Sequence, residues 1–181
     1  MASVIRVTKE FPFEMAHALW NYDGPCRNVH GHSYRLFVTL SGVPLEEEGN
    51  PKNGMVIDFN ELKVIKEFLD GFVDHRFLID IEDPLLKSWM EKYGLKMEDL
   101  KVNDAGFVFN QSCLQDQCEI EFFDSFVILP FVPTSENLAL WLFSVVEGLV
   151  HKVNKELGKR VKMVKLRWWE SDSSFAEVDR S

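Results

Sequence analysis

Three of the five histidines in this sequence lie close together near its N-terminus. His30 and His32 flank Gly31, and His17 precedes them in a neighbouring segment. Residues two apart on a β-strand point to the same side, about 6.5–7 Å apart, so two imidazoles at this spacing can reach one ion. His17 can join them from the other strand of a hairpin. Glycine between the two histidines leaves the opposite face free and the backbone adaptable.

Three neutral imidazoles predict a metal site with a fourth tetrahedral position open, which is typical of catalytic zinc. Iron and copper also accept imidazole ligands, so zinc is the best fit and not the only one. The competing interpretation is that each histidine is a core residue whose ring nitrogens are satisfied by hydrogen bonds. Three histidines on two adjacent strands favour the metal site.

Cys26 lies four residues before His30 and allows two interpretations. As a fourth ligand it would give a closed, structural zinc site of the Cys-His₃ type. As a free thiol beside a metal and a histidine it would have a lowered pKa and act as a base or nucleophile.

An Asp-His pair and one glutamate are further candidates for chemistry. Asp74 and His75 can act as an orienting group and a proton carrier, or they are an ordinary polar pair in a loop. Glu170 ends a strand whose inward residues over 164–168 are apolar, so its carboxylate needs a partner if it is buried. Water can supply that partner, as can a ligand edge with two adjacent N–H donors, such as that of a pterin.

The elements that must position these residues start with two strands. Period-two alternation predicts strands over residues 4–19 and 29–43, with turn residues from Gly42 to Asn53. On the first strand, the alternation places His17 on the same face as Phe11, Phe13 and Met15.

Helices and further strands follow. The sequence predicts Asp58 as a helix N-cap, with Glu61 three residues later as its partner in a capping box. The apolar residues of this helix recur at helical spacing: Leu62, Ile65, Leu69 and Phe72. The other expected elements are a short helix capped by Asp83 with Pro84 at its first position and ending at Gly94, strands at 119–123 and 126–131, a helix from 135 to about 157, and a strand over 161–170.

The composition limits the class of protein. At 181 residues with 46% hydrophobic residues, the chain predicts one α+β domain over residues 1–181. A net charge of −9 argues against nucleic-acid binding. No apolar run approaches the roughly 20 residues of a membrane span. The first residues lack a signal-peptide core, so we expect a cytoplasmic protein.

The remaining cysteines carry no assigned role. Three cysteines do not suggest a disulfide framework. Cys113 and Cys118 lack the flanking pairs of a zinc finger, so we interpret them as bystander thiols.

Six segments occur here in the order typical of one enzyme family. They are FEMAHAL, CRNVHGHSY, VIDFNELK, VDHRFL, PTSEN and WESDSSFAEV. With them, residues 5–80 and 131–178 resemble the family of the 6-pyruvoyltetrahydropterin and 6-carboxytetrahydropterin synthases.

The resemblance implies a fold and an assembly. The expected fold is the tunnelling fold, in which each subunit contributes a four-stranded antiparallel sheet with two helices on one face. Three subunits close a barrel and two trimers stack, so a homohexamer is expected. Residues 81–130 match none of the motifs and are expected to be an insertion, and Ile79 stands where the family often has asparagine.

The resemblance also implies roles for individual residues. It assigns Zn²⁺ to His17, His30 and His32, and makes Cys26 the catalytic cysteine. The other roles that it implies are proton handling by Asp74 and His75, anchoring of the pterin ring by Glu170, and lining of the pocket by Pro133, Thr134 and Glu136.

The implied reaction starts from 7,8-dihydroneopterin triphosphate. The spacing of Cys26 from His30 resembles the bacterial group that forms 6-carboxytetrahydropterin, with loss of acetaldehyde and triphosphate. Two alternatives stay open: a lyase that eliminates triphosphate to form the pyruvoyl product, and a zinc- and pterin-binding protein without turnover. The basic residues that would bind the triphosphate are not identified by any spacing.

Overall fold

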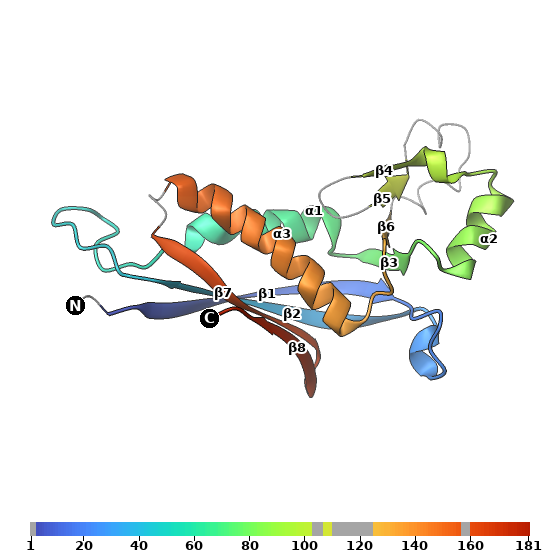
Figure 1. Cartoon of the computed structure of the whole chain (residues 1–181), viewed down its shortest axis with the longest axis horizontal. Helices are drawn as coiled ribbons and strands as arrows, with labels where there is room; N and C mark the ends of the chain where they lie inside the picture. The colour runs from blue at the N-terminus through green and yellow to red at the C-terminus, as the bar shows by residue number, and fades with distance from the viewer. Residues whose placement is uncertain (1–2, 103–106, 110–124, 157–159) are drawn as a thin grey trace.

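An antiparallel pair of long strands forms the centre of the fold. These strands are β1 (Ile5–His17) and β2 (His30–Gly42), which pair along their whole length from Ile5 opposite Gly42 to His17 opposite His30. The computed structural model describes residues 3–102, 107–109, 125–156 and 160–181 (Figure 1).

The described strands make one mixed sheet of eight. Its order is β4 (Leu100–Val102), β5 (Phe107–Phe109), β6 (Phe126–Leu129), β3 (Arg76–Asp80), β1, β2, β7 (Val161–Ser171) and β8 (Ser174–Asp179). The four strands from β1 to β8 along this order are antiparallel. On the other side, β3 runs parallel to β1 and β6 runs parallel to β3.

Two helices cover one face of the antiparallel strands. They are α1 (Lys63–Phe72) and α3 (Ser135–Glu156), and Figure 1 shows both on the same side of the sheet. A third helix, α2 (Pro84–Lys92), follows β3 and packs against the β3–β6 end. Short 3₁₀ turns are η1 (Pro25–Arg27), η2 (Phe59–Leu62) and η3 (Met97–Asp99). None of the helices within the described ranges is long and apolar enough to span a membrane.

The main core lies between this sheet face and the two helices. As the alternation predicts, Phe11, Phe13 and Met15 of β1 are buried on one face, and the same face continues to the buried His17. The helices supply the opposing layer, with fully buried residues that include Ile65, Leu69, Leu138, Leu142 and Phe143. The apolar core therefore ends, along β1, at the histidine of the candidate metal site.

The expected four-stranded sheet is wrong for the described chain as a whole. The antiparallel four are present, but β3 and β6 join β1 at its C-terminal end and widen the sheet. We missed β3 because RFLID has no polar–apolar alternation: four of its five residues are buried. We missed β8 because its edge position leaves it mostly exposed and little apolar. The expected strand at 119–123 lies outside the described residues.

The two expected helix N-caps, Asp83 and Asp58, have different outcomes. Asp83 accepts a hydrogen bond from the Leu85 amide with Pro84 at the first position, which confirms the expected N-cap. Asp58 accepts from the Asn60 amide and caps η2, which leads into α1. The expected capping box is wrong, because the Glu61 carboxylate pairs with Lys52 instead of bonding back to the cap.

We expect Leu142→Ala to lower the free energy of unfolding by about 2–5 kcal/mol, because it leaves a cavity in the packed layer under α3. Leu140→Ala on the same helix is the matched control. Leu140 is 54% exposed, so its truncation should change stability by less than about 0.5 kcal/mol. Urea denaturation measures both values, and equal effects of the two changes would contradict this packing.

Candidate metal centre

The register of β1 and β2 brings the three histidines together. His17 lies directly opposite His30, and His32 follows two residues later on the same face. One ring nitrogen from each of the three lies within 4.8 Å of the others. Gly31 lets the strands approach, because a Cβ there would lie 3.1 Å from the Met15 carbonyl oxygen. The predicted cluster therefore forms within a single chain.

Backbone carbonyls orient two of the three rings. His17 Nδ1 lies 2.8 Å from the Pro133 carbonyl oxygen, and His30 Nδ1 lies 2.7 Å from that of Asn28. A carbonyl oxygen only accepts, so each Nδ1 donates, and in the neutral ring the lone pair is left on Nε2. Ligand histidines are typically held in this way, by a hydrogen bond from the nitrogen that does not bind the metal.

In His17 and His30, the ring nitrogen that remains for a metal is buried and has no hydrogen-bond partner among the described residues. Nε2 of His17 and Nε2 of His30 are both buried, and neither makes a hydrogen bond with the described residues. Burial lowers the pKa of His17 below its usual value, although the Pro133 hydrogen bond and the Glu170 charge act in the opposite direction. His17 is therefore neutral near pH 7, the state in which imidazole binds metal. A divalent ion such as Zn²⁺ fits this donor set, since it would satisfy both orphaned nitrogens.

The cluster has three ligand residues and not four. Among the described residues, the group that could hold an ion consists of His17, His30 and His32 and does not include Cys26. The geometry thus favours the open arrangement over the closed Cys-His₃ alternative.

Glu170 lies at the edge of the histidine cluster. Its Oε1 is 3.5 Å from His17 Nε2, and its side chain is 26% exposed. The carboxylate also lines a cavity of about 510 Å³ between the start of α3 and β8. Other lining residues are Ser135, Glu136, Leu140, Phe175 and Glu177. Glu170 therefore connects the candidate metal centre to a cavity large enough for a small ring system.

The segment before α3 links that helix to the histidines. The Pro133 carbonyl holds the His17 ring, and the Thr134 hydroxyl accepts a hydrogen bond from the Asn137 amide at 3.3 Å. Glu136 lines the same cavity as Glu170. The three residues expected to line a pocket thus lie beside the site, although only Glu136 contributes to this cavity wall.

Cys26 lies in the connection between β1 and β2, on the turn η1. Its carbonyl oxygen accepts a hydrogen bond from the Leu19 amide at 2.9 Å. Next to Leu19, Trp20 Nε1 donates to Oδ2 of the buried Asp80 at 2.8 Å, which ties this connection to the end of β3. The Cys26 loop is therefore closed by a bond between its own backbone groups and tied to the end of β3.

Asp74 and His75 form a bonded pair at the start of β3. Asp74 Oδ1 accepts from the Glu14 amide at 2.8 Å and lies 3.0 Å from His75 Nδ1. Burial opposes ionisation of Asp74, but these two contacts outweigh it and lower its pKa. His75 has φ +59°, an uncommon conformation for a residue other than glycine, and its side chain is 78% exposed.

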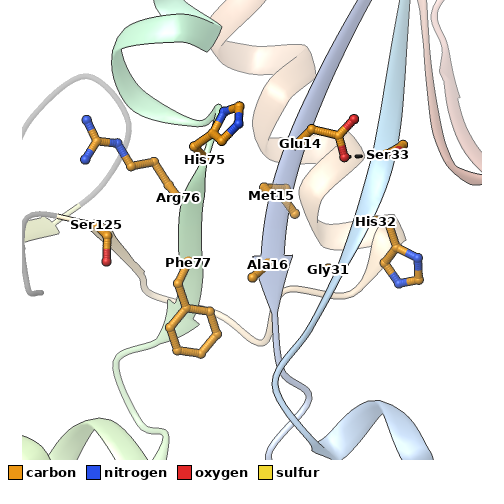
Figure 2. A pocket seen from close by; sticks show the side chains of 10 residues that line it. All are labelled: Glu14, Met15, Ala16, Gly31, His32, Ser33, His75, Arg76, Phe77 and Ser125. Carbon is orange, nitrogen blue, oxygen red and sulfur yellow. Dashed lines mark hydrogen bonds between the residues drawn. The ribbon is translucent and has the colours of Figure 1, made fainter.

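His75 lines a second pocket, and Glu170 is not among the residues that line it. Figure 2 shows His75 and His32 on the flanking strands of a pocket of about 410 Å³, with Glu14, Met15 and Ala16 of β1 between them. Cys26 is not among the described residues that line this pocket. One chain therefore places His75 across β1 from His32, and this pocket does not include Cys26.

Tyr34 is a neighbour of the site that the sequence argument missed. It follows His32 by two residues, and its ring centroid lies 5.4 Å from that of His32 and 6.1 Å from that of His17. Burial raises the pKa of Tyr34, and the negative charge of Glu170 raises it further. The alternation of side chains along the strand was sufficient to place Tyr34 beside His32. It did not indicate a functional role, because a tyrosine in an apolar strand is typical of a core residue.

Comparisons with known proteins give a consistent result. The family model described as 6-pyruvoyl tetrahydropterin synthase matches residues 6–181. The chain is similar to the 6-carboxy-5,6,7,8-tetrahydropterin synthase of Haemophilus influenzae, with 36% identity over 65% of this chain and 88% of that one. The Aquifex aeolicus protein of the same name is 30% identical over 94% and 95% of the two chains. An uncharacterized protein from Wolinella succinogenes has a solved structure with a TM-score of 0.81, 30% identity, and coverage of 99% and 100%.

We expect His17→Ala to weaken zinc binding by more than about 100-fold, which exceeds the roughly 10- to 100-fold effect typical of losing only a hydrogen-bonding partner of a ligand. Zinc retained after dialysis against a weak chelator, measured by elemental analysis, reports the loss. His151→Ala on the exposed side of α3 is the control and should retain zinc like the unchanged protein. Full zinc retention by His17→Ala would contradict the assigned ligand set.

Proposed function

The chain belongs to the 6-pyruvoyl tetrahydropterin synthase family, and from this premise we propose that it is a zinc-dependent lyase. The proposed reaction converts 7,8-dihydroneopterin triphosphate and water to 6-carboxy-5,6,7,8-tetrahydropterin, with release of acetaldehyde and triphosphate. The observation that carries the proposal is the cluster of three histidines, with two buried and unpartnered Nε2 atoms, beside the carboxylate of Glu170. The names of the Haemophilus and Aquifex relatives support the carboxy-forming branch.

The histidines would hold the metal. Zinc bound by His17, His30 and His32 would supply Lewis-acid polarisation of the oxygens on the pterin side chain. The carbonyl of Pro133 and that of Asn28 keep two of the rings in the tautomer that binding needs. These contacts fix the ring orientations before a ligand arrives, which lowers the cost of assembling the site.

Glu170 would anchor the pterin ring. Its carboxylate lines the 510 Å³ cavity while remaining within 3.5 Å of His17. Two adjacent N–H groups of the pterin can donate to its two oxygens, which is the strongest form of recognition open to a carboxylate. A ring bound in this way directs its side chain towards the histidines.

Cys26, Asp74 and His75 would handle protons. A thiolate at Cys26 would remove a proton from the side chain, and the His75 ring would relay one through Nε2. Asp74 supports this role because it stays ionised and accepts from His75 Nδ1. Cys26 is not among the described residues that line the pocket of His75, which is consistent with a site completed by a second chain.

A homohexamer made of two trimers is part of the proposal. β1 pairs with β3 only over Met15–His17, so residues 5–14 of its edge have no partner strand within the described chain. The outer edge of β8 is likewise unpaired among the described strands. Open edges of this kind pair with strands of other chains.

The family description favours one alternative, the pyruvoyl-forming lyase. Both reactions would use the same residues and differ in the fate of the side chain. Mass spectrometry of the products from 7,8-dihydroneopterin triphosphate and zinc-loaded protein separates them. Carboxypterin with acetaldehyde supports the proposal. A pyruvoylpterin would contradict the carboxy-forming branch, and no product would contradict both lyases and leave a binding protein.

We expect Cys26→Ala to lower kcat by at least about 100-fold, the usual effect of losing a general base. Zinc content and pterin affinity should stay close to those of the unchanged protein, because the thiol is not among the ligands. Cys113→Ala is the matched control and should retain turnover. Unchanged turnover in the Cys26 variant would remove the proposed mechanism.

We expect Glu170→Gln to raise the dissociation constant for a pterin by roughly 10- to 100-fold, because one charged acceptor becomes a donor. Glu177→Gln lines the same cavity, but Glu177 is paired with Lys165 and Arg167, so this control should bind pterin nearly normally. Isothermal titration calorimetry measures both. Equal losses in the two variants would argue that charge in the cavity, and not Glu170 itself, holds the ring.

A further inference from the structure

The hydroxyl group of Tyr34 is buried without a hydrogen bond. The residue is 1% exposed, and Oη has no partner among the described residues. A buried donor without an acceptor costs folding free energy, whereas a phenylalanine would fill the same space without that cost. Such a group in a well-packed position calls for a partner that the described part of the chain does not provide.

Packing prevents the ring from turning to find a partner. Its centroid lies 4.7 Å from that of Trp168 and 5.7 Å from that of Phe13, with which it is stacked. Both neighbours are themselves buried. The position of Oη is therefore fixed by the core, as expected for a group that binds a ligand from a preorganised position.

The surroundings of the ring show where such a partner would lie. Tyr34 presents itself edge-on to His17 and His32, at interplanar angles of 86° and 77°. Glu170 Oε1 lies 3.5 Å from Nε2 of His17, one of these two histidines. Tyr34 thus lies beside the histidine cluster, at whose edge the proposed ring anchor Glu170 lies.

We propose that Tyr34 contacts the substrate, and that its Oη donates a hydrogen bond to an oxygen on the hydroxylated side chain of the pterin. This inference rests on the proposed function, because it takes the ring end of the ligand to lie at Glu170 and the side chain to lie at the histidines. Tyr34 packs against two of these histidines, so its hydroxyl meets the side chain and not the distal edge of the ring. Tyr34 therefore selects for pterins that carry an oxygen-bearing side chain.

The test compares two stable ligands on the zinc-loaded protein with and without Tyr34→Phe. Neopterin carries a trihydroxypropyl side chain, and unsubstituted pterin lacks it. We expect Tyr34→Phe to weaken neopterin binding by roughly 3- to 10-fold, the effect of one net hydrogen bond, and to leave pterin binding unchanged. Tyr93→Phe removes a hydroxyl that accepts a hydrogen bond from Lys92 at the end of α2, and is the matched control, with no change for either ligand.

Stability and metal content separate this role from a structural one. Tyr34→Phe should retain zinc and unfold at the same temperature as the unchanged protein or a higher one, because an unpartnered hydroxyl is removed. A fall of several degrees would mean that the hydroxyl has a structural partner, and would overturn the inference. Equal weakening of neopterin and pterin, or no weakening of either, would also overturn it.

Binding of the two ligands to the unchanged protein shows whether a negative result rules out the proposed function or only the role of Tyr34. If the zinc-loaded protein binds neither ligand, the proposed pterin site is wrong and the role of Tyr34 falls with it. If the unchanged protein binds both and Tyr34→Phe binds neopterin equally well, the pterin site stands and only the role of Tyr34 is removed.

Discussion

The pairing register of β1 and β2 is the constraint on which the rest of the site depends. It places His17 opposite His30 and Met15 opposite His32, so three imidazoles from two strands share one face. A slip of one residue would turn a whole strand over and separate the histidines. It would also expose Phe11 and Phe13, which are buried in the main core. Burial of the core therefore enforces the geometry of the site.

Within a few residues, the same face of the sheet passes from the hydrophobic core to the candidate metal site. Met15 is core, His17 is a candidate ligand, and Tyr34 lies at the boundary with its ring packed and its hydroxyl unpartnered. Unsatisfied polar atoms are rare in folded proteins and concentrate where a ligand completes them. Here several such atoms lie in the histidine cluster and at Tyr34, which is why the metal and the substrate are inferred at the same place.

The sequence predicted the parts that depend on local periodicity and short motifs. The alternation in β1, the His-Gly-His spacing and the Asp83 cap each act within a few residues, and the structure has all three. Long-range pairing was not accessible: RFLID becomes a central parallel strand only because β1 and β6 lie on either side of it. The role of Tyr34 was missed for a similar reason, since its unpartnered hydroxyl is a property of the packed neighbours. The resemblance predicted Asp74 and His75, but sequence could not show that His75 and His32 line one pocket from either side of β1.

The most direct test of the central claim is zinc K-edge X-ray absorption of the zinc-loaded protein without substrate. An open site held by His17, His30 and His32 predicts nitrogen and oxygen neighbours at about 2.0–2.1 Å, with imidazole scattering and no sulfur. A sulfur neighbour at about 2.3 Å would place Cys26 in the coordination sphere. That result would make the zinc site closed and structural, and would contradict the catalytic account.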